Sequence, residues 1–237
     1  MNVNKKAHAA GLGKAVAEVL EGPVYLAYCI CWFVTIAVSL FTAVVWLNQN
    51  SLSLTIVVAV SLAAMIIPFA LLKLRRNRNS AIVRRFASYI KAIYISEWIG
   101  LAFLILLLLL FAIAYLLGGN VRAEMLEVIR DDSGTIISML VSLAVIPPNL
   151  VFHKRFIKML KETASILDGK PEDAACFQPA VKAALLAVFA QIVWSCMYIA
   201  TRGNWISALS VVQAVLLWLV LRDAATKAGS VNQSDNN

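Results

Sequence analysis

Long apolar runs dominate this chain of 237 residues. The hydrocarbon core of a bilayer is about 30 Å thick, so a helix needs about 20 apolar residues to cross it. Six segments approach or exceed that length, and in lipid a helix is the form that satisfies their backbone hydrogen bonds internally. They are Val24–Leu47, Leu52–Leu72, Ile93–Leu117, Thr135–Phe152, Val181–Ala200 and Ile206–Leu221. The sequence therefore predicts an all-α fold: a polytopic membrane protein with a bundle of six transmembrane helices arranged as three hairpins.

Composition supports the membrane prediction. Hydrophobic residues make up 61% of the chain and charged residues 14%, against roughly 45–50% and about 25% in soluble domains. A soluble fold of this size has no means of covering so much apolar surface with charge. The net charge is +8, and the basic residues cluster at the ends of the apolar runs. That placement favours contact with anionic lipid headgroups and argues against nucleic acid as a partner.

The distribution of Lys and Arg predicts the orientation. Of 21 such residues, only Arg122, Arg130 and Arg202 fall on one side of the predicted spans. The positive-inside rule places the richer side in the cytoplasm. Both termini are then cytoplasmic, which agrees with an even number of spans. The expected location is a bacterial-type cytoplasmic membrane. The predicted parts are a cytoplasmic N-terminal segment (1–23), a six-span transmembrane domain (24–222) and a polar cytoplasmic tail (223–237).

The N-terminal segment has the pattern of an amphipathic helix. Leu12, Val16, Val19 and Leu20 recur at helical spacing, which is typical of a helix that lies on the inner leaflet. Two nearby glycines oppose helix formation, so a loosely ordered segment is the alternative.

Two predicted cytoplasmic loops also carry apolar stripes flanked by cations. One follows the second span and the other follows the fourth. Such helices graze the headgroup layer, and a docking surface for a protein partner is a compatible alternative. The candidate headgroup or partner contacts are Lys73, Arg75, Arg76, Arg84, Arg85, Lys154, Arg155 and Lys158.

Glu97 lies about one turn inside the third predicted span. An acidic residue in a span is costly unless it is solvated or paired. It either reaches headgroup water or pairs with Lys73 or Lys91, or it forms a proton or cation site.

Gln191 and Gln213 occupy matching depths of the fifth and sixth spans, because each lies about ten residues from the loop near Arg202. At 1.5 Å per residue both are near the midplane. They are expected to hydrogen-bond each other and hold the hairpin together. Lining of a polar path is the alternative.

Three prolines fall within spans: Pro68, Pro147 and Pro148. Each is predicted to kink its helix. Asn149 directly follows the proline pair and is a candidate partner for a carbonyl that the kink releases.

No sequence motif for catalysis or for a bound cofactor is present. Only His8 and His153 are available as histidines, and the four cysteines have neither the spacing of a zinc site nor that of a disulfide framework. We therefore expect no cofactor, no metal and no enzymatic activity.

The remaining features favour a membrane-embedded component of a transport system, a permease-like subunit. Its basic inner loops would meet a cytoplasmic partner such as an ATPase, and self-association into a homo-oligomer is a further candidate interaction. The first alternative is a scaffold or regulatory membrane protein that transports nothing. The second is an intramembrane enzyme acting on lipids, for which Glu97, Asn149 and His153 would have to converge at the inner face.

Overall fold

The computed structural model describes residues 2–46, 66–117, 127, 133–170, 175–203 and 205–234. Within these residues the regular structure is entirely helical, with seven α-helices and one short 3-10 turn. The elements are α1 (Asn2–Glu21), α2 (Pro23–Trp46), α4 (Ile66–Asn77), α5 (Ser80–Leu117), α7 (Ser133–Leu167), α8 (Phe177–Arg202), η1 (Trp205–Ser207) and α9 (Ala208–Ser234).

Five of these helices are long and apolar enough to cross a membrane, which is consistent with a multi-pass membrane protein. The apolar stretches are Pro23–Phe41, Ser80–Leu116, Ile137–Leu167, Phe177–Thr201 and Ala208–Val231. Most of the predicted second span, Leu52–Leu72, lies outside the described residues, and its last seven residues begin α4. The count of six spans and their arrangement as three hairpins therefore stay predictions.

Two helices are much longer than predicted. α5 continues the third span back to Ser80, and α7 continues the fourth span on to Leu167. At 1.5 Å per residue, the 38 residues of α5 extend about 57 Å, well beyond the hydrocarbon thickness. The cationic stretches that we expected to be separate helices in loops are thus extensions of the spans, because their apolar faces continue to pack against each other.

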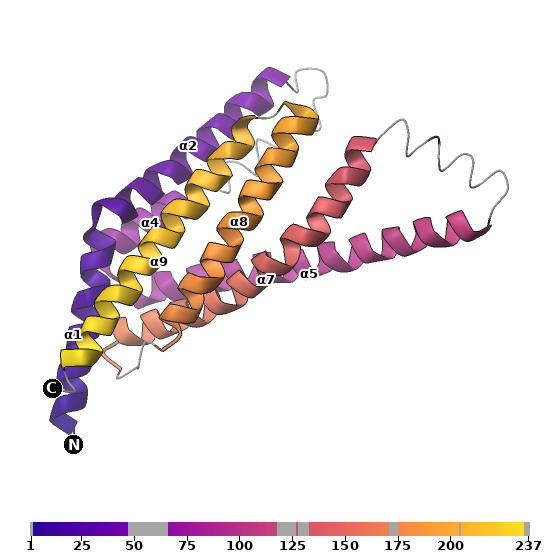
Figure 1. Cartoon of the computed structure of the whole chain (residues 1–237). Coiled ribbons are helices and arrows are strands. Elements are labelled where there is room, and N and C mark those ends of the chain that lie inside the picture. Colours follow the sequence, from indigo (N-terminus) through magenta and orange to yellow (C-terminus); the bar gives the residue numbers. More distant parts are fainter. Residues whose placement is uncertain are drawn as a thin grey trace.

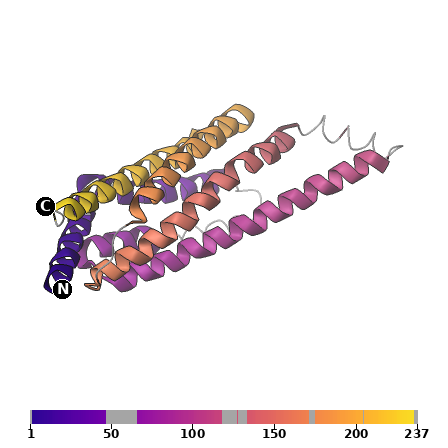
Figure 2. The same cartoon turned by 60° about the horizontal axis from the view of Figure 1, so that its bottom comes forward.

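The helices form an elongated bundle (Figures 1 and 2). α7 packs between α5 and α8, α8 packs on α9, and α9 also contacts α1 and α2. The start of α1 and the end of α9 lie together at one end of the molecule, while the far end of α5 diverges from α8 and α9. Large apolar side chains of that outer part are exposed, including Phe103, Leu110 and Leu116.

α1 is helical, but its apolar stripe does not face outward onto a leaflet. Leu12 is completely buried, and Val16, Val19 and Leu20 are also buried. They join the main apolar core, in which α1 contacts α9, α7, α4 and α2. An amphipathic pattern requires an apolar neighbour without specifying which one, and here the neighbour is protein.

The predicted polar tail also belongs to a helix, because α9 passes Arg222 without interruption and ends at Ser234. Ala224, Ala225 and Ala228 are buried. These small side chains let α1 lie close to the end of α9. Packing against α1 therefore supports α9 in a region where hydropathy alone predicts no helix.

Candidate functional site

The strongest candidate site is a polar pair between α5 and α7. Oε2 of Glu97 lies 2.8 Å from Nδ1 of His153. The side chains are 19% and 15% exposed, respectively. With Glu97 ionised, Nδ1–H of His153 donates this hydrogen bond, and the pairing satisfies two groups that would be costly to leave alone among apolar helices.

The partner of Glu97 differs from the two that we expected. Lys73 and Lys91 are both exposed, and the residue that reaches the carboxylate is His153. The sequence brought Glu97 and His153 together only in the lipid-enzyme alternative, which required them to converge with Asn149. Glu97 is near one end of the third predicted span, and His153 directly follows the end of the fourth that the predicted topology places on the same side. Antiparallel neighbouring helices place such positions at the same depth.

Aromatic rings position His153. Its ring lies 5.3 Å from that of Phe152, which stacks on Phe156 at 5.3 Å. Phe156 in turn meets Phe86 of α5 edge to face, with 6.2 Å between ring centroids. This aromatic packing fixes α5 against α7 immediately beside the polar pair.

Asn149 lies one helical turn before His153 on α7 and is partly buried. α7 stays helical through Pro147 and Pro148, and its two halves run in different directions in Figure 1. Within the described part of the chain, the side chain of Asn149 makes no hydrogen bond to Glu97. The site is therefore a pair, with Asn149 close along the helix but not joined to it.

A second polar cluster links α8 to α9. The hydroxyl of Ser210 donates to Oε1 of Gln191 at 3.3 Å, and Ser195 donates to the carbonyl of Ser207 at 2.8 Å. The predicted hydrogen bond between Gln191 and Gln213 is absent, since Nε2 of Gln213 is buried with no partner among the described residues. This hairpin is therefore held by serine hydroxyls, which contact the facing helix, and not by a hydrogen bond between the two glutamines.

The cationic candidates have different surroundings. Arg75 donates to the backbone carbonyl of Glu21 at 3.1 Å, Arg84 pairs with Asp168, and Lys158 lies 3.9 Å from Glu162. The others are exposed on the surface: Lys73, Arg76, Arg85, Lys154 and Arg155. Pro68, the remaining proline of the predicted kinks, is buried near the start of the described part of α4.

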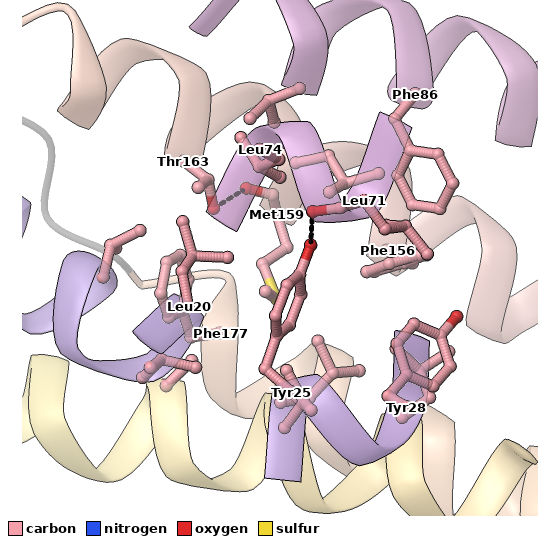
Figure 3. A pocket seen from close by; sticks show the side chains of 18 residues that line it. Leu20, Tyr25, Tyr28, Leu71, Leu74, Phe86, Phe156, Met159, Thr163 and Phe177 are labelled. Carbon is pink, nitrogen blue, oxygen red and sulfur yellow. Dashed lines mark hydrogen bonds between the residues drawn. The ribbon is translucent and has the colours of Figure 1, made fainter. Parts of the chain in front are cut away.

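The core encloses an apolar cavity of about 80 Å³ where α1, α2, α4, α5, α7, α8 and α9 meet (Figure 3). Tyr25 projects into the middle of it, and its hydroxyl donates to the carbonyl of Leu71 at 3.0 Å. Phe86 and Phe156 lie on one side of Tyr25, with Leu20 and Phe177 on the other. The side chains of the lining are apolar apart from the hydroxyls of Tyr25, Tyr28 and Thr163, and those of Tyr25 and Thr163 donate to backbone carbonyls.

Two charged contacts lie at the C-terminal end of α7, in the stretch between Glu162 and Asp168. Hydrogen bonding by Ser80, followed by that of Arg84, holds the pKa of Asp168 below its usual range. Burial raises the pKa of the Cys176 thiol far above its usual value, and so does its 2.6 Å hydrogen bond to Glu162. Cys176 is therefore a thiol at neutral pH, and the thiolate that a nucleophilic role needs is suppressed.

No family model, no curated protein and no solved structure matches this chain. The function proposed for it therefore rests on the geometry of its own residues. Among the described residues, no group of three or more His, Cys, Asp or Glu is placed to hold a metal ion.

Proposed function

We propose that this chain is the membrane-embedded component of a transport system and that the Glu97–His153 pair binds the proton that couples to transport. The observation that carries the proposal is the 2.8 Å contact between an acid and an imidazole on two helices that are each apolar enough to span a membrane. Ionisable residues in such helices are rare and usually mark ion or proton pathways.

The chemistry of the pair suits proton binding. An imidazole nitrogen and a carboxylate oxygen can each accept a proton, and here the two groups share one hydrogen bond. Because α5 and α7 each contribute one group, a change in protonation alters the attraction between two helices. That is the kind of local charge change that shifts the packing of a helix pair.

We propose no catalytic role for the pair. In a hydrolase the second ring nitrogen of the histidine faces a nucleophile. Within the part of the chain that the structure describes, Nε2 of His153 makes no hydrogen bond to a hydroxyl or a thiol. Cys176 is engaged by Glu162 instead.

The orientation in the proposal follows from charge. The cationic extensions of α5 and α7 would lie in the cytoplasm together with both termini, at the inner face of a bacterial-type cytoplasmic membrane. There they would meet anionic headgroups and a cytoplasmic protein partner such as an ATPase. Self-association into a homo-oligomer belongs to the same proposal, since apolar side chains of α5 such as Phe103 and Leu110 are exposed.

A scaffold that transports nothing is the second candidate, and the core favours it. The cavity where the helices meet is small and apolar, and the hydroxyls of Tyr25 and Thr163 in its lining already donate to backbone carbonyls. A dry core of this kind offers no polar path for a solute. The two candidates therefore differ in whether the polar pair moves protons.

Proton flux decides between them. The purified protein is reconstituted in liposomes that contain a pH-sensitive dye, and a potassium diffusion potential is imposed with valinomycin. We expect proton entry above that of protein-free liposomes for the wild type, and entry at the protein-free rate for Glu97→Gln. Lys154→Gln, which changes an exposed neighbour of His153, is the matched control and should retain the wild-type flux.

Equal flux in wild-type, Glu97→Gln and protein-free liposomes would refute proton coupling and favour the scaffold. The ATPase partner is tested separately by purification in mild detergent from cells that express the chain at its natural level. A stoichiometric ATPase subunit would support that part of the proposal, and isolation of the chain alone would contradict it.

A further inference from the structure

A groove runs between the cytoplasmic extensions of α5 and α7, beside the Glu97–His153 pair. Its volume is about 460 Å³. Its floor includes Ala87 and Ala164, which are 4% and 1% exposed, so the small side chains allow the two helices to approach closely. Four cations surround it: Arg84, Lys91, Lys161 and Lys170.

The charge of the groove is unbalanced. Asp168 is the acid that pairs with Arg84 at one end. Lys91, Lys161 and Lys170 are exposed cations with no ion pair among the described residues. A ligand with two or more negative charges would complement this arrangement, because three cations without an ion pair line the same groove.

The groove lies where the cationic part of α5 meets its apolar part. Lys91 is six residues before Glu97, or about 9 Å along the helix, and Arg84 is about 10 Å further from the apolar part. This is the depth range of a headgroup layer when the apolar part of α5 occupies the hydrocarbon.

The apolar surface continues from the groove along the same helical face. Ile95 and Ile99 follow Lys91 at intervals of four residues, and they are 48% and 66% exposed. Residues four apart lie above one another on a helix. The face of α5 that presents a cation at the groove therefore presents an uncovered apolar strip directly above it.

We propose that this groove binds the headgroup of an anionic phospholipid that carries two phosphates, with the acyl chains along the exposed strip of α5. Lys91 and Lys161 hold one phosphate near the membrane boundary, and Lys170 faces the other, while Arg84 stays paired with Asp168. Basic pockets between transmembrane helices on the cytoplasmic side have the chemistry that binds such headgroups. This inference is separate from proton coupling, because it concerns a lipid ligand and other residues.

Native mass spectrometry of the purified full chain tests it. The protein in mild detergent is titrated with diphosphatidylglycerol and, in parallel, with phosphatidylcholine. We expect selective binding of the two-phosphate lipid. Binding should be roughly tenfold to thirtyfold weaker in the double variant Lys91→Gln/Lys161→Gln, because each cation near an anionic headgroup raises the affinity roughly fivefold. The conservative variant Lys91→Arg/Lys161→Arg should keep most of the affinity.

The matched control is Lys73→Gln/Arg76→Gln, which removes the same charge from α4, outside the groove. An equal loss of lipid in this control would overturn the proposal in favour of general surface attraction. Unchanged binding in Lys91→Gln/Lys161→Gln would also overturn it. Displacement of the lipid by millimolar inorganic phosphate would assign the groove to free anions and contradict a lipid site.

The readouts separate this proposal from proton coupling. Bound lipid is counted on a protein that is not transporting, and Glu97→Gln should bind it normally. Thermal unfolding of each variant in the same detergent verifies that the fold is retained, so a loss of lipid cannot be attributed to unfolding.

Discussion

Glu97 and His153 are 56 residues apart in the chain, yet the carboxylate of one lies 2.8 Å from the ring nitrogen of the other. Replacing Glu97 with Ala should leave the histidine without its partner in a largely buried position. We expect thermal unfolding in mild detergent to show that the free energy of unfolding falls by about 1–3 kcal/mol, the usual cost of leaving a buried polar group without a partner.

Glu97→Gln is the control for this stability prediction. The amide oxygen still accepts from Nδ1–H, so its loss should be clearly smaller than that of Glu97→Ala. Identical melting temperatures for Glu97→Ala and wild type would mean that the pair does not hold α5 to α7.

Two glycines of α1 are expected to respond differently to replacement by Ala. A Cβ at Gly11 would lie 2.9 Å from Cγ1 of Val231 on α9, whereas a Cβ at Gly13 meets nothing within 4 Å. Gly13→Ala should stabilise the protein by up to about 1 kcal/mol, the ordinary helix preference of Ala over Gly. Gly11→Ala should lose that gain, because Val231 has to shift.

A rescue experiment checks the cause. In Val231→Ala the obstructing methyl groups are removed, so adding Gly11→Ala to this background should become stabilising. If Gly11→Ala changed stability equally in the wild-type and Val231→Ala backgrounds, close packing of α1 against the end of α9 would be contradicted.

Tyr25 ties α2 to α4 through its hydrogen bond to the carbonyl of Leu71. Tyr25→Phe removes only the hydroxyl, so the packing in the core is kept. We expect thermal unfolding to report a loss of about 1 kcal/mol, the net value of one buried hydrogen bond. Tyr89→Phe, an exposed position, should change stability by less than about 0.5 kcal/mol, and equal effects of the two variants would contradict the prediction.

Asp168 should make stability depend on pH in the acid range. Ser80 and Arg84 hold its pKa below the ordinary value of about 4. The unfolded chain therefore takes up this proton first as the pH falls. The contribution is fully present above pH 4 and is lost as the pH falls through the lower pKa of the folded state.

Comparing wild type with Asp168→Asn tests this sign. The difference in melting temperature should be constant from pH 7 to about pH 5 and should shrink towards zero in more acid solution. A difference that grows as the pH falls would contradict it. The side chain is exposed to solvent, so the effect should also weaken in high salt.

The apolar spans were predictable because lipid makes length and hydropathy decisive. The predicted span Val181–Ala200 lies within α8, which begins at Phe177 and ends at Arg202. The helix that carries the fourth predicted span is longer than the span: hydropathy falls at His153, yet α7 continues to Leu167 because Phe156, Met159 and Leu160 remain buried. Hydropathy measures affinity for lipid and does not register burial against another helix.

The candidate site was predictable only in part. A charge within a span marks Glu97 as unusual from sequence alone, but its partner requires knowing which helices are neighbours and how they are rotated. The nearest cations along the chain, Lys73 and Lys91, were the expected partners, and His153 was considered only in the lipid-enzyme alternative. For Gln191 the depth was informative, but rotation about the helix axis decided that Ser210, not Gln213, meets it.

Cysteine labelling tests the central claim, which is that the apolar part of α5 crosses a bilayer with its cationic end in the cytoplasm. In a background lacking Cys29, Cys31, Cys176 and Cys196, single cysteines replace Asn79 and Glu127, both exposed in the structure. With a membrane-impermeant maleimide on intact cells, Glu127→Cys should label at once, and Asn79→Cys only after the membrane is permeabilised. Labelling of both positions in intact cells at equal rates would contradict the account.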